Sequence, residues 1–404
     1  MASSSYIRWF GEIGLDDVPS VGGKTASLGE LYSALTSEGV RVPNGFAITA
    51  AAYRDALTAS GAGDELRKLL SGLDKRKVAD LSRRAAAARA LVFAATDRDD
   101  LRANLSAAYA ELEQQYGRNL AVAVRSSATA EDLPTASFAG QHESFLNIRG
   151  GRELFDACRR CFASLFTDRA ISYRVDNGFD HFKVALSVAV MKMVRSDLAA
   201  SGVMFTLDTE SGFRDVVFVT GTYGLGENIV QGAVEPDEFY VHKPTFKMGS
   251  RVVLSRRLGA KDKRMVYGRG HSTTRNVSTS ASERRRFCIS DQDVLRLAGY
   301  AVAVEDHYSA KAARPMPMDI EWAKDGKDGE LYIIQARPET VASQKSPAVL
   351  ENYVLKSAGR ELASGRAVGE KIATGKVRRV ATKRDLRTFK PGEVLVAPST
   401  SPDW

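Results

Sequence analysis

The chain has 404 residues, which is too long for one small domain and suggests two or three folding units. Its 44% hydrophobic and 26% charged residues are typical of an ordinary soluble globular protein. No apolar run approaches the roughly 18 residues that span a bilayer, and the N-terminal residues lack a secretory signal pattern. We therefore expect a cytoplasmic protein with no membrane partner.

The net charge of +8 raises nucleic acid as a partner. The basic residues are, however, spread along the chain with acidic residues between them, and no nucleic-acid-binding signature accompanies them. We expect no nucleic-acid partner, and a basic RNA-binding protein is kept only as a competing hypothesis.

The chain has three cysteines, and two of them, Cys158 and Cys161, form a lone C-x-x-C motif. Without a second pair, or a nearby histidine at ligand spacing, this motif does not indicate a metal site. Because the two residues share one face of an expected helix, we predict that they pack in the core.

Helical patterns predominate in the first third of the chain. Residues 20–38 open with Gly22-Gly23-Lys24 and continue as a helix, and a short strand after a Pro-Asn-Gly turn leads into a second helix from about Ala50. Residues 64–117 carry Ala, Arg and Leu at helical spacing, which predicts two or three surface helices.

Short apolar strands predominate over residues 121–254, in an order that favours an α+β fold over a regular βαβ repeat. Residues 260–290 are basic and weakly periodic, and we expect an exposed connection there. An amphipathic helix over 291–308 precedes two strands, MDIEWA and LYIIQA, which a hairpin joins. Residues 349–369 are interpreted as a polar helical linker, after which a new β-rich unit begins.

The segment over residues 124–145, VRSSATAEDLPTASFAGQHESF, follows a buried strand and combines Arg125 with serines, threonines and a glycine. Small hydroxyl residues and glycine leave backbone N–H groups free to wrap an anion, and a guanidinium adds a fixed cationic fork. Long loops without periodic structure are usually functional or disordered. Since Leu133, Phe138 and Phe145 are unusual in a linker, we predict a lid over phosphates.

Two carboxylates, an amide and a guanidinium alternate on the strands of the predicted hairpin. Asp319 and Glu321 share one face of the first strand, and Gln335 and Arg337 share one face of the second. Oxygen ligands suit Mg²⁺, which takes one or two carboxylates and completes its shell with phosphate and water. An arginine beside them would hold the phosphates. The alternative is a cross-strand salt bridge on a solvated sheet.

Two weaker motifs contain glycines. The sequence before Lys24 resembles the end of a P-loop, but Val18 stands where the first glycine is needed, so a surface lysine near a helix start is the simpler interpretation. In GTYGLGENIVQG the glycines are not in the dinucleotide-binding order. This turn would either place Glu227 against ribose hydroxyls or serve only as a connection.

Together these motifs resemble the nucleotide-binding half of the dikinases that work through a phosphohistidine, the family of phosphoenolpyruvate synthase and pyruvate phosphate dikinase. The matching phrases follow one another through residues 6–342: VGGKTASLGEL, VPNGFAITA, AVRSSATAEDLPTASFAGQHESFLN, GLGENIVQGAVEPDEFYVHKP, MDIEWAKDG and IIQARPETV. Their wording is nearer to the synthases than to the other members.

The resemblance implies an ATP-grasp fold of two α+β lobes that clamp Mg-ATP. Residues 1–200 would form the first lobe, with a helical insertion, and residues 201–342 the second lobe, with the metal site. A helical linker over residues 343–369 would then lead into the start of a β-rich swivelling phosphohistidine domain, incomplete, over residues 370–404.

The resemblance also implies roles for the residues that bind phosphate and metal. Lys24, Arg125 and Arg337 would hold the phosphates and supply most of the catalysis, while Glu321 and Gln335 would bind magnesium.

Further residues are implied in nucleotide binding. Asp319 would support the metal site, Glu227 would meet the ribose, and the backbone near Met193 would read the edge of adenine. The remaining residues lie in the segment that would close over the phosphates: Ser126, Ser127 and Thr129.

The family's phosphohistidine segment and its pyruvate-binding domain have no counterpart in these residues, and none of the five histidines lies in the corresponding context. We therefore expect the chain to bind ATP without completing the cycle that turns ATP, pyruvate and water into AMP, phosphoenolpyruvate and phosphate. The missing domains would be its partners, and a homodimer stays open. Competing hypotheses are the ATP-binding part of rifampicin phosphotransferase or pyruvate phosphate dikinase, and a non-catalytic nucleotide-binding module.

Overall fold

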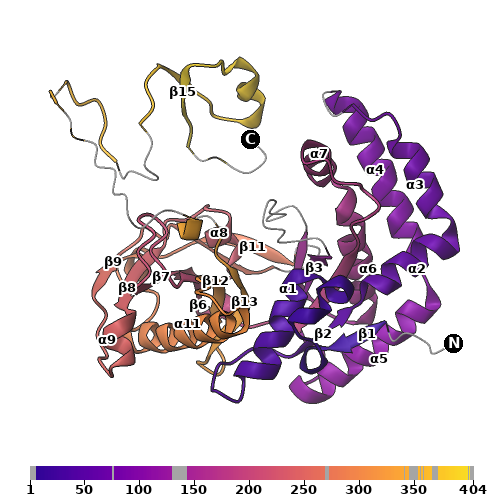
Figure 1. Ribbon diagram of the computed structural model, residues 1–404, viewed down its shortest axis with the longest axis horizontal. Helices are drawn as coiled ribbons and strands as arrows, with labels where there is room; N and C mark the ends of the chain where they lie inside the picture. Colours follow the sequence, from indigo (N-terminus) through magenta and orange to yellow (C-terminus); the bar gives the residue numbers. More distant parts are fainter. Residues whose placement is uncertain are drawn as a thin grey trace.

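The computed structural model describes most of the chain as two lobes side by side, with a small unit formed by the C-terminal residues (Figure 1). The described residues are 6–74, 77–129, 143–268, 273–340, 342–344, 354, 356–357, 359–365, 372–398 and 400. Their mixed helices and strands confirm the α+β class.

The first lobe is built on a five-stranded antiparallel sheet with the order β1-β2-β5-β3-β4. Its strands are β1 (Ile7–Trp9), β2 (Gly45–Ile48), β3 (Val122–Ala128), β4 (Ser144–Ile148) and β5 (Leu186–Lys192). The long apolar run around β5 is a buried strand, as its composition predicts.

Helices cover one face of this sheet and enclose the larger apolar core (Figure 1). They are α2 (Ala50–Ser60), α3 (Ala62–Leu70), α4 (Val78–Ala95), α5 (Asp99–Tyr116), α6 (Gly151–Ala163) and α7 (Asp168–Asp176). The helices predicted over residues 64–117 are confirmed as α3, α4 and α5. Cys158 and Cys161 are buried in this core as free thiols, which confirms their packing role.

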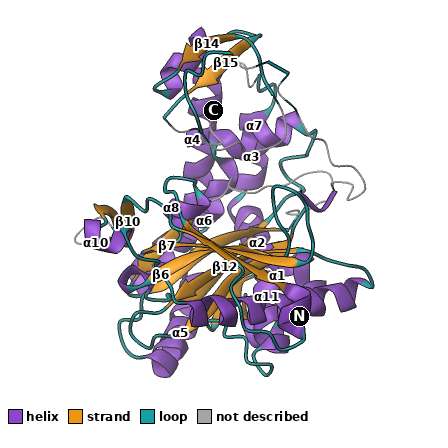
Figure 2. Ribbon diagram, turned by 90° about the vertical axis from the view of Figure 1, so that its left-hand side faces the viewer, coloured by secondary structure: helices purple, strands orange, loops and turns teal. Residues whose placement is uncertain are grey.

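The second lobe is built on a six-stranded antiparallel sheet with the order β13-β12-β6-β7-β8-β9 (Figure 2). Its strands are β6 (Ala200–Phe205), β7 (Val216–Tyr223), β8 (Asp237–His242), β9 (Ser255–Arg257), β12 (Met318–Lys324) and β13 (Leu331–Pro338). Helix α11 (Asp291–Ala312) packs against the sheet through Val294, Leu297 and Val304. Its first turn is fixed by a capping box between Ser290 and Asp293. The short helices α8 (Glu227–Val230) and α9 (Lys243–Lys247) flank β8 in the chain.

Helix α1 (Val18–Glu30) lies between the two sheets and joins them. Its Val21 and Leu28 share one apolar core with Met191 of the first sheet and Ile320 of the second. Burial of this shared core against both sheets fixes the position of α1 at the junction of the lobes.

The described residues of 260–290 are mostly exposed or half-buried, as expected, but they form regular structure rather than a simple connection. Strands β10 (Lys263–Tyr267) and β11 (Thr274–Ser278) form an antiparallel hairpin, followed by α10 (Ala281–Arg284). Lys261 is fully buried in an ion pair with Asp237. Lys261 is an exception to the exposure of this segment, because the acid that pairs with it is distant in sequence.

The predicted helical linker is wrong where the structure describes it, because residues 359–365 form neither helix nor strand. Residues 345–353 and 366–371 lie outside the described residues. Strands β14 (Lys376–Arg379) and β15 (Glu393–Val396) form a parallel pair, in line with the predicted β-rich composition. Among the helices of the described residues, none has the length and apolarity to cross a membrane.

Candidate functional site

The hairpin of β12 and β13 carries the acidic end of the candidate site. Asp319 pairs with Arg337 and Glu321 with Gln335 in the antiparallel register, so the four side chains share one face as predicted. A β-bulge follows Glu321, because Trp322 pairs with residue 333 rather than 334. The sequence pattern did not reveal this bulge.

Arg125 of β3 connects the first lobe to this hairpin. Its Nη2 lies 2.7 Å from Glu321 Oε2, and its Nη1 donates to the carbonyl of Ile334, the residue that the bulge inserts, at 3.1 Å. The two charged side chains are only 19% and 15% exposed. Burial raises the pKa of Glu321, but Arg125, Lys24 and Arg337 together outweigh it and hold this pKa below its usual value.

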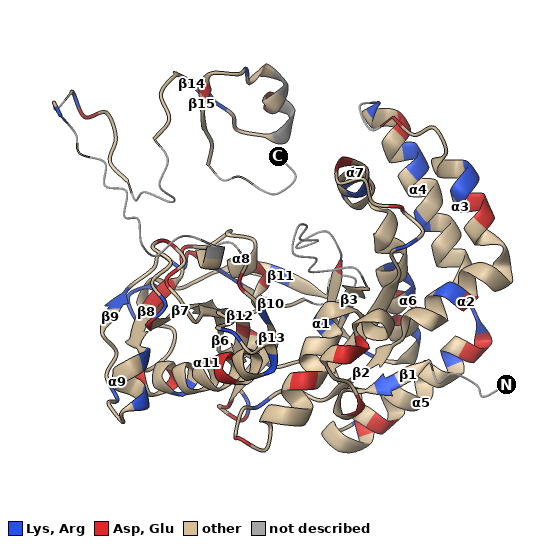
Figure 3. Ribbon diagram, viewed as in Figure 1, with Lys and Arg blue, Asp and Glu red and all other residues tan. Residues whose placement is uncertain are grey.

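Arg337 and Asp319 form the cross-strand salt bridge that was the alternative interpretation of the hairpin. Arg337 Nε and Nη2 lie 2.9 and 2.8 Å from Asp319 Oδ2. Burial raises the pKa of Asp319, and Arg337 offsets this only in part. Figure 3 shows acidic and basic segments side by side around β12 and β13.

Lys24 lies within α1, in the turn that follows a kink of the helix at Gly22. The φ of Gly22 is +74°, and a Cβ there would lie 2.3 Å from Ser127 Oγ, so only glycine fits this approach. The N–H of Thr25 donates to Ser127 Oγ at 3.2 Å. The kink of α1 is therefore held against β3, with Lys24 beside the charged cluster formed by Arg125, Asp319, Glu321 and Arg337.

A cavity of about 440 Å³ opens between α1, α11 and β13 next to these charges. Lys24, Thr129 and Arg337 line it, together with apolar side chains such as Leu15 and Met316. Thr129 thus lies on the same side as the predicted phosphate-binding residues.

The predicted lid was placed from residue 124 onward, but β3 continues to Ala128, so Arg125, Ser126 and Ser127 belong to a strand. Because side chains alternate along β3, Ser126 lies on the face opposite to Arg125. Its hydroxyl donates to the Glu143 carbonyl at 3.3 Å. Ser126 therefore does not join the cluster. Residues 130–142 of the lid lie outside the described residues.

An apolar cluster lies farther along the same face of β3. Ala121 and Ala123 pack there with Met193 and Leu225. The N–H of Met193 donates to the Ala121 carbonyl at 3.0 Å. This N–H is therefore not available as the donor that would read the edge of adenine. At about 3.4 Å per residue, Ala123 and Ala121 lie about 7 and 14 Å from Arg125 along the strand.

Glu227 begins α8, directly after the glycine-containing turn. Its Oε2 is buried with no hydrogen-bond partner in the described structure. Burial raises the pKa of Glu227, while nearby Arg125 lowers it and Glu321 raises it further. Glu227 thus lies near Arg125 and Glu321, two residues after Leu225 of the apolar cluster.

The oxygen ligands that Glu321 and Gln335 offer fit magnesium. In the described residues no group of three or more His, Cys, Asp or Glu side chains is arranged as a metal site. Glu321 and Gln335 supply two oxygen ligands on one face, which is sufficient for Mg²⁺ because this ion usually keeps water and phosphate as its other ligands. Arg125 donates to one of the two carboxylate oxygens of Glu321.

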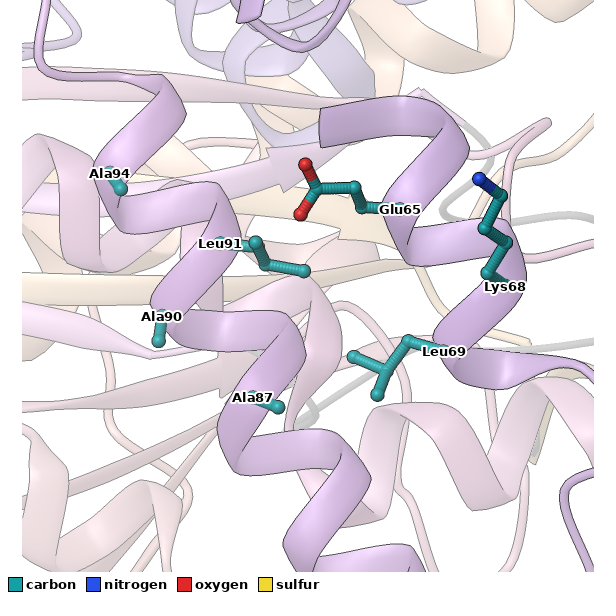
Figure 4. Close-up of a pocket in the computed structure, with 7 residues that line it drawn as sticks. All are labelled: Glu65, Lys68, Leu69, Ala87, Ala90, Leu91 and Ala94. Carbon is teal, nitrogen blue, oxygen red and sulfur yellow. The ribbon is translucent and has the colours of Figure 1, made fainter. Parts of the chain in front are cut away.

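A larger cavity, of about 720 Å³, lies elsewhere, between α3 and α4 (Figure 4). Leu69 and Leu91, with Ala87, Ala90 and Ala94, form an apolar floor, and Glu65 and Lys68 stand at its edge. It offers no convergent polar groups and shares no residue with the charged cluster.

Comparison with known proteins supports the same region. The family described as "Pyruvate phosphate dikinase, AMP/ATP-binding domain" matches residues 18–356. Curated relatives named phosphoenolpyruvate synthase are 51% identical in Synechocystis sp. and 47% identical in Escherichia coli, and the matches cover 99% and 100% of this chain. The chain spans 50% of the length of each. A solved D-cycloserine synthetase covers 59% of this chain and 54% of its own at 12% identity, but its TM-score of 0.24 is too low to support an argument.

Proposed function

The chain belongs to the family of the pyruvate phosphate dikinase AMP/ATP-binding domain, and from that premise we propose that it is the Mg-ATP-binding part of a phosphoenolpyruvate synthase. The two lobes would act as an ATP-grasp clamp. The observation that carries the proposal is the meeting of Arg125 from the first lobe with Glu321 from the second, beside Lys24 and Arg337.

The groups that meet near the junction of the lobes match the parts of ATP. The apolar cluster at Ala121 and Ala123 suits the base, Glu227 suits the ribose hydroxyls, and the cations suit the phosphates. A bound magnesium ion would neutralise phosphate charge and be held by Glu321 and Gln335.

The chain's own residues would position the phosphates for transfer. Lys24 acts as a point charge, while Arg125 and Arg337 present planar forks that match phosphate oxygens. Release of AMP requires cleavage between the α- and β-phosphates, with a nucleophile on the β-phosphorus. In the whole protein we propose a histidine in that role, and pyruvate as the final acceptor, as the names of the relatives suggest.

Calorimetric titration of Mg-ATP into the chain tests the proposal. We expect binding that Lys24→Gln weakens about 10- to 100-fold, the value of a hydrogen bond to a charged group. Lys247→Gln is the matched control, because Lys247 forms an exposed ion pair with Asp306 at 2.7 Å on the second lobe. Absence of Mg-ATP binding to the unaltered chain, or equal effects of the two substitutions, would contradict the proposal.

A further inference from the structure

The β10–β11 hairpin is an element of the cleft that the sequence did not predict. It is fixed to the turn that carries Glu227, because Leu225 N–H donates to the Met265 carbonyl at 2.9 Å. Asn228 Nδ2 also donates to Asn276 Oδ1 of β11 at 2.7 Å. The position of the hairpin relative to the proposed ribose carboxylate is therefore set by hydrogen bonds.

The hairpin also reaches the first lobe. Asn147, at the end of β4, donates from Nδ2 to the Thr273 carbonyl at 3.0 Å. The guanidinium of Arg195 lies 4.5 Å from the ring centre of Tyr267, and that of Arg149 lies 5.9 Å from it. Tyr267 thus lies close to two guanidinium groups, one from the residue after β4 and one from the connection between β5 and β6.

Tyr267 lies at the edge of the apolar cluster beside β3. Together with Met265 it packs against the cluster that contains Ala121, Ala123 and Met193. Its hydroxyl is buried and has no hydrogen-bond partner in the described structure. A buried hydroxyl without a partner is destabilising unless a ligand or water satisfies it. Burial also raises the pKa of Tyr267, so the hydroxyl stays protonated and available as a donor.

We propose that Tyr267 is a specificity-determining residue of the nucleotide site, whose ring covers the base and whose hydroxyl donates a hydrogen bond to an acceptor nitrogen of adenine. The inference rests on the proposed function and adds to it a base-reading residue from β10. The hydroxyl, rather than the Met193 N–H, would then supply a donor to the base, because that N–H is bonded to Ala121.

The test compares Mg-ATP with Mg-tripolyphosphate, which has the phosphates but no base, by calorimetry on the full chain. Tyr267→Phe keeps the ring and removes the hydroxyl, and we expect it to weaken Mg-ATP about fivefold while leaving Mg-tripolyphosphate unchanged. Tyr267→Ala also removes the ring, and we expect a loss of about 10- to 100-fold for Mg-ATP alone.

Tyr240→Phe is the control. It removes a hydroxyl on β8 that donates to Asp208 Oδ1 at 3.3 Å. An unchanged affinity of Tyr267→Phe for Mg-ATP would overturn the inference and leave the proposed function standing. Equal weakening of Mg-ATP and Mg-tripolyphosphate would also overturn it, since the residue would then act through the fold. If the unaltered chain bound neither probe, the proposed function would fail first, and this inference with it.

Discussion

Replacement of Glu321 by glutamine separates the two partners that this carboxylate is proposed to serve. Glu321 pairs with Arg125 at 2.7 Å, and with Mg-ATP bound it would hold magnesium. Glutamine keeps the shape and an oxygen but removes the charge. The substitution should therefore affect stability through Arg125 and ligand binding through the metal.

The expected loss of stability follows from the geometry of the pair. Removing one partner of a fully buried ion pair costs about 3–5 kcal/mol, whereas a hydrogen bond to a charged group is worth about 1.5–3 kcal/mol. Because the two side chains are 19% and 15% exposed, water reaches the arginine left behind. We expect the free energy of unfolding in urea at pH 7 to fall by about 2 kcal/mol.

Glu321→Gln should change metal-free binding and magnesium-dependent binding in different ways. With its carboxylate partner removed, Arg125 is free for phosphate, so metal-free tripolyphosphate should bind Glu321→Gln at least as tightly as the unaltered chain. The gain in affinity that magnesium gives should fall about tenfold or more, because a charged ligand is lost.

Glu305→Gln is the matched control for Glu321→Gln. It opens an equally close pair, in which Lys243 Nζ lies 2.7 Å from Glu305, with exposed fractions of 9% and 13%. It should cost similar stability and leave the magnesium dependence of binding intact. If Glu321→Gln kept its full magnesium dependence, or lost metal-free binding to the same degree, the assignment of Glu321 as a metal ligand would be refuted.

Three further substitutions, one of them with a matched control, test other parts of the structure. Glu227→Gln should raise the free energy of unfolding at pH 7, because burial raises the pKa of this carboxyl and penalises its charged form; the gain should disappear in urea titrations as pH falls below about 4.3, where the carboxyl becomes protonated in both states. Gly22→Ala should cost about 3 kcal/mol, since φ is +74° and the new Cβ would lie 2.3 Å from a serine hydroxyl of β3. Gly39→Ala, at φ +91° in open space, should cost only about 1 kcal/mol, and equal losses would contradict the close approach. Lys261→Met should cost about 3–5 kcal/mol by the same measurement, because it leaves Asp237 buried without its cation, and a loss below about 1 kcal/mol would contradict this pairing.

Local patterns were sufficient to predict the hairpin that carries the acidic residues. Period-two alternation placed Asp319 with Glu321 and Gln335 with Arg337, and the register confirms that the four share a face. The same rule, applied to β3, would have separated Ser126 from Arg125. In the sequence, the hydroxyl residues and glycine of this segment predict a loop, although the strand extends to Ala128.

Charge did not predict the burial of Lys261. Lys261 is buried because Asp237, on β8, accepts its hydrogen bond, and Arg264 lies 2.8 Å from Glu283. A basic residue in a sequence window says nothing of an acid that the fold brings from another strand. The bulge after Glu321 was equally invisible, since strand periodicity assigns one residue to each position of the ladder.

The pair that defines the site could not be derived from spacing, because Arg125 and Glu321 are 196 residues apart and belong to different sheets. Each residue alone fits a simpler role, as a strand cation or as half of a cross-strand pair. The ion pair between Arg125 and Glu321 joins the two lobes. It also occupies the groups that phosphate and magnesium would need. Mg-ATP would therefore exchange this contact for two others, Arg125 with phosphate and Glu321 with magnesium. Binding and the contact between the lobes are then coupled through a single ion pair.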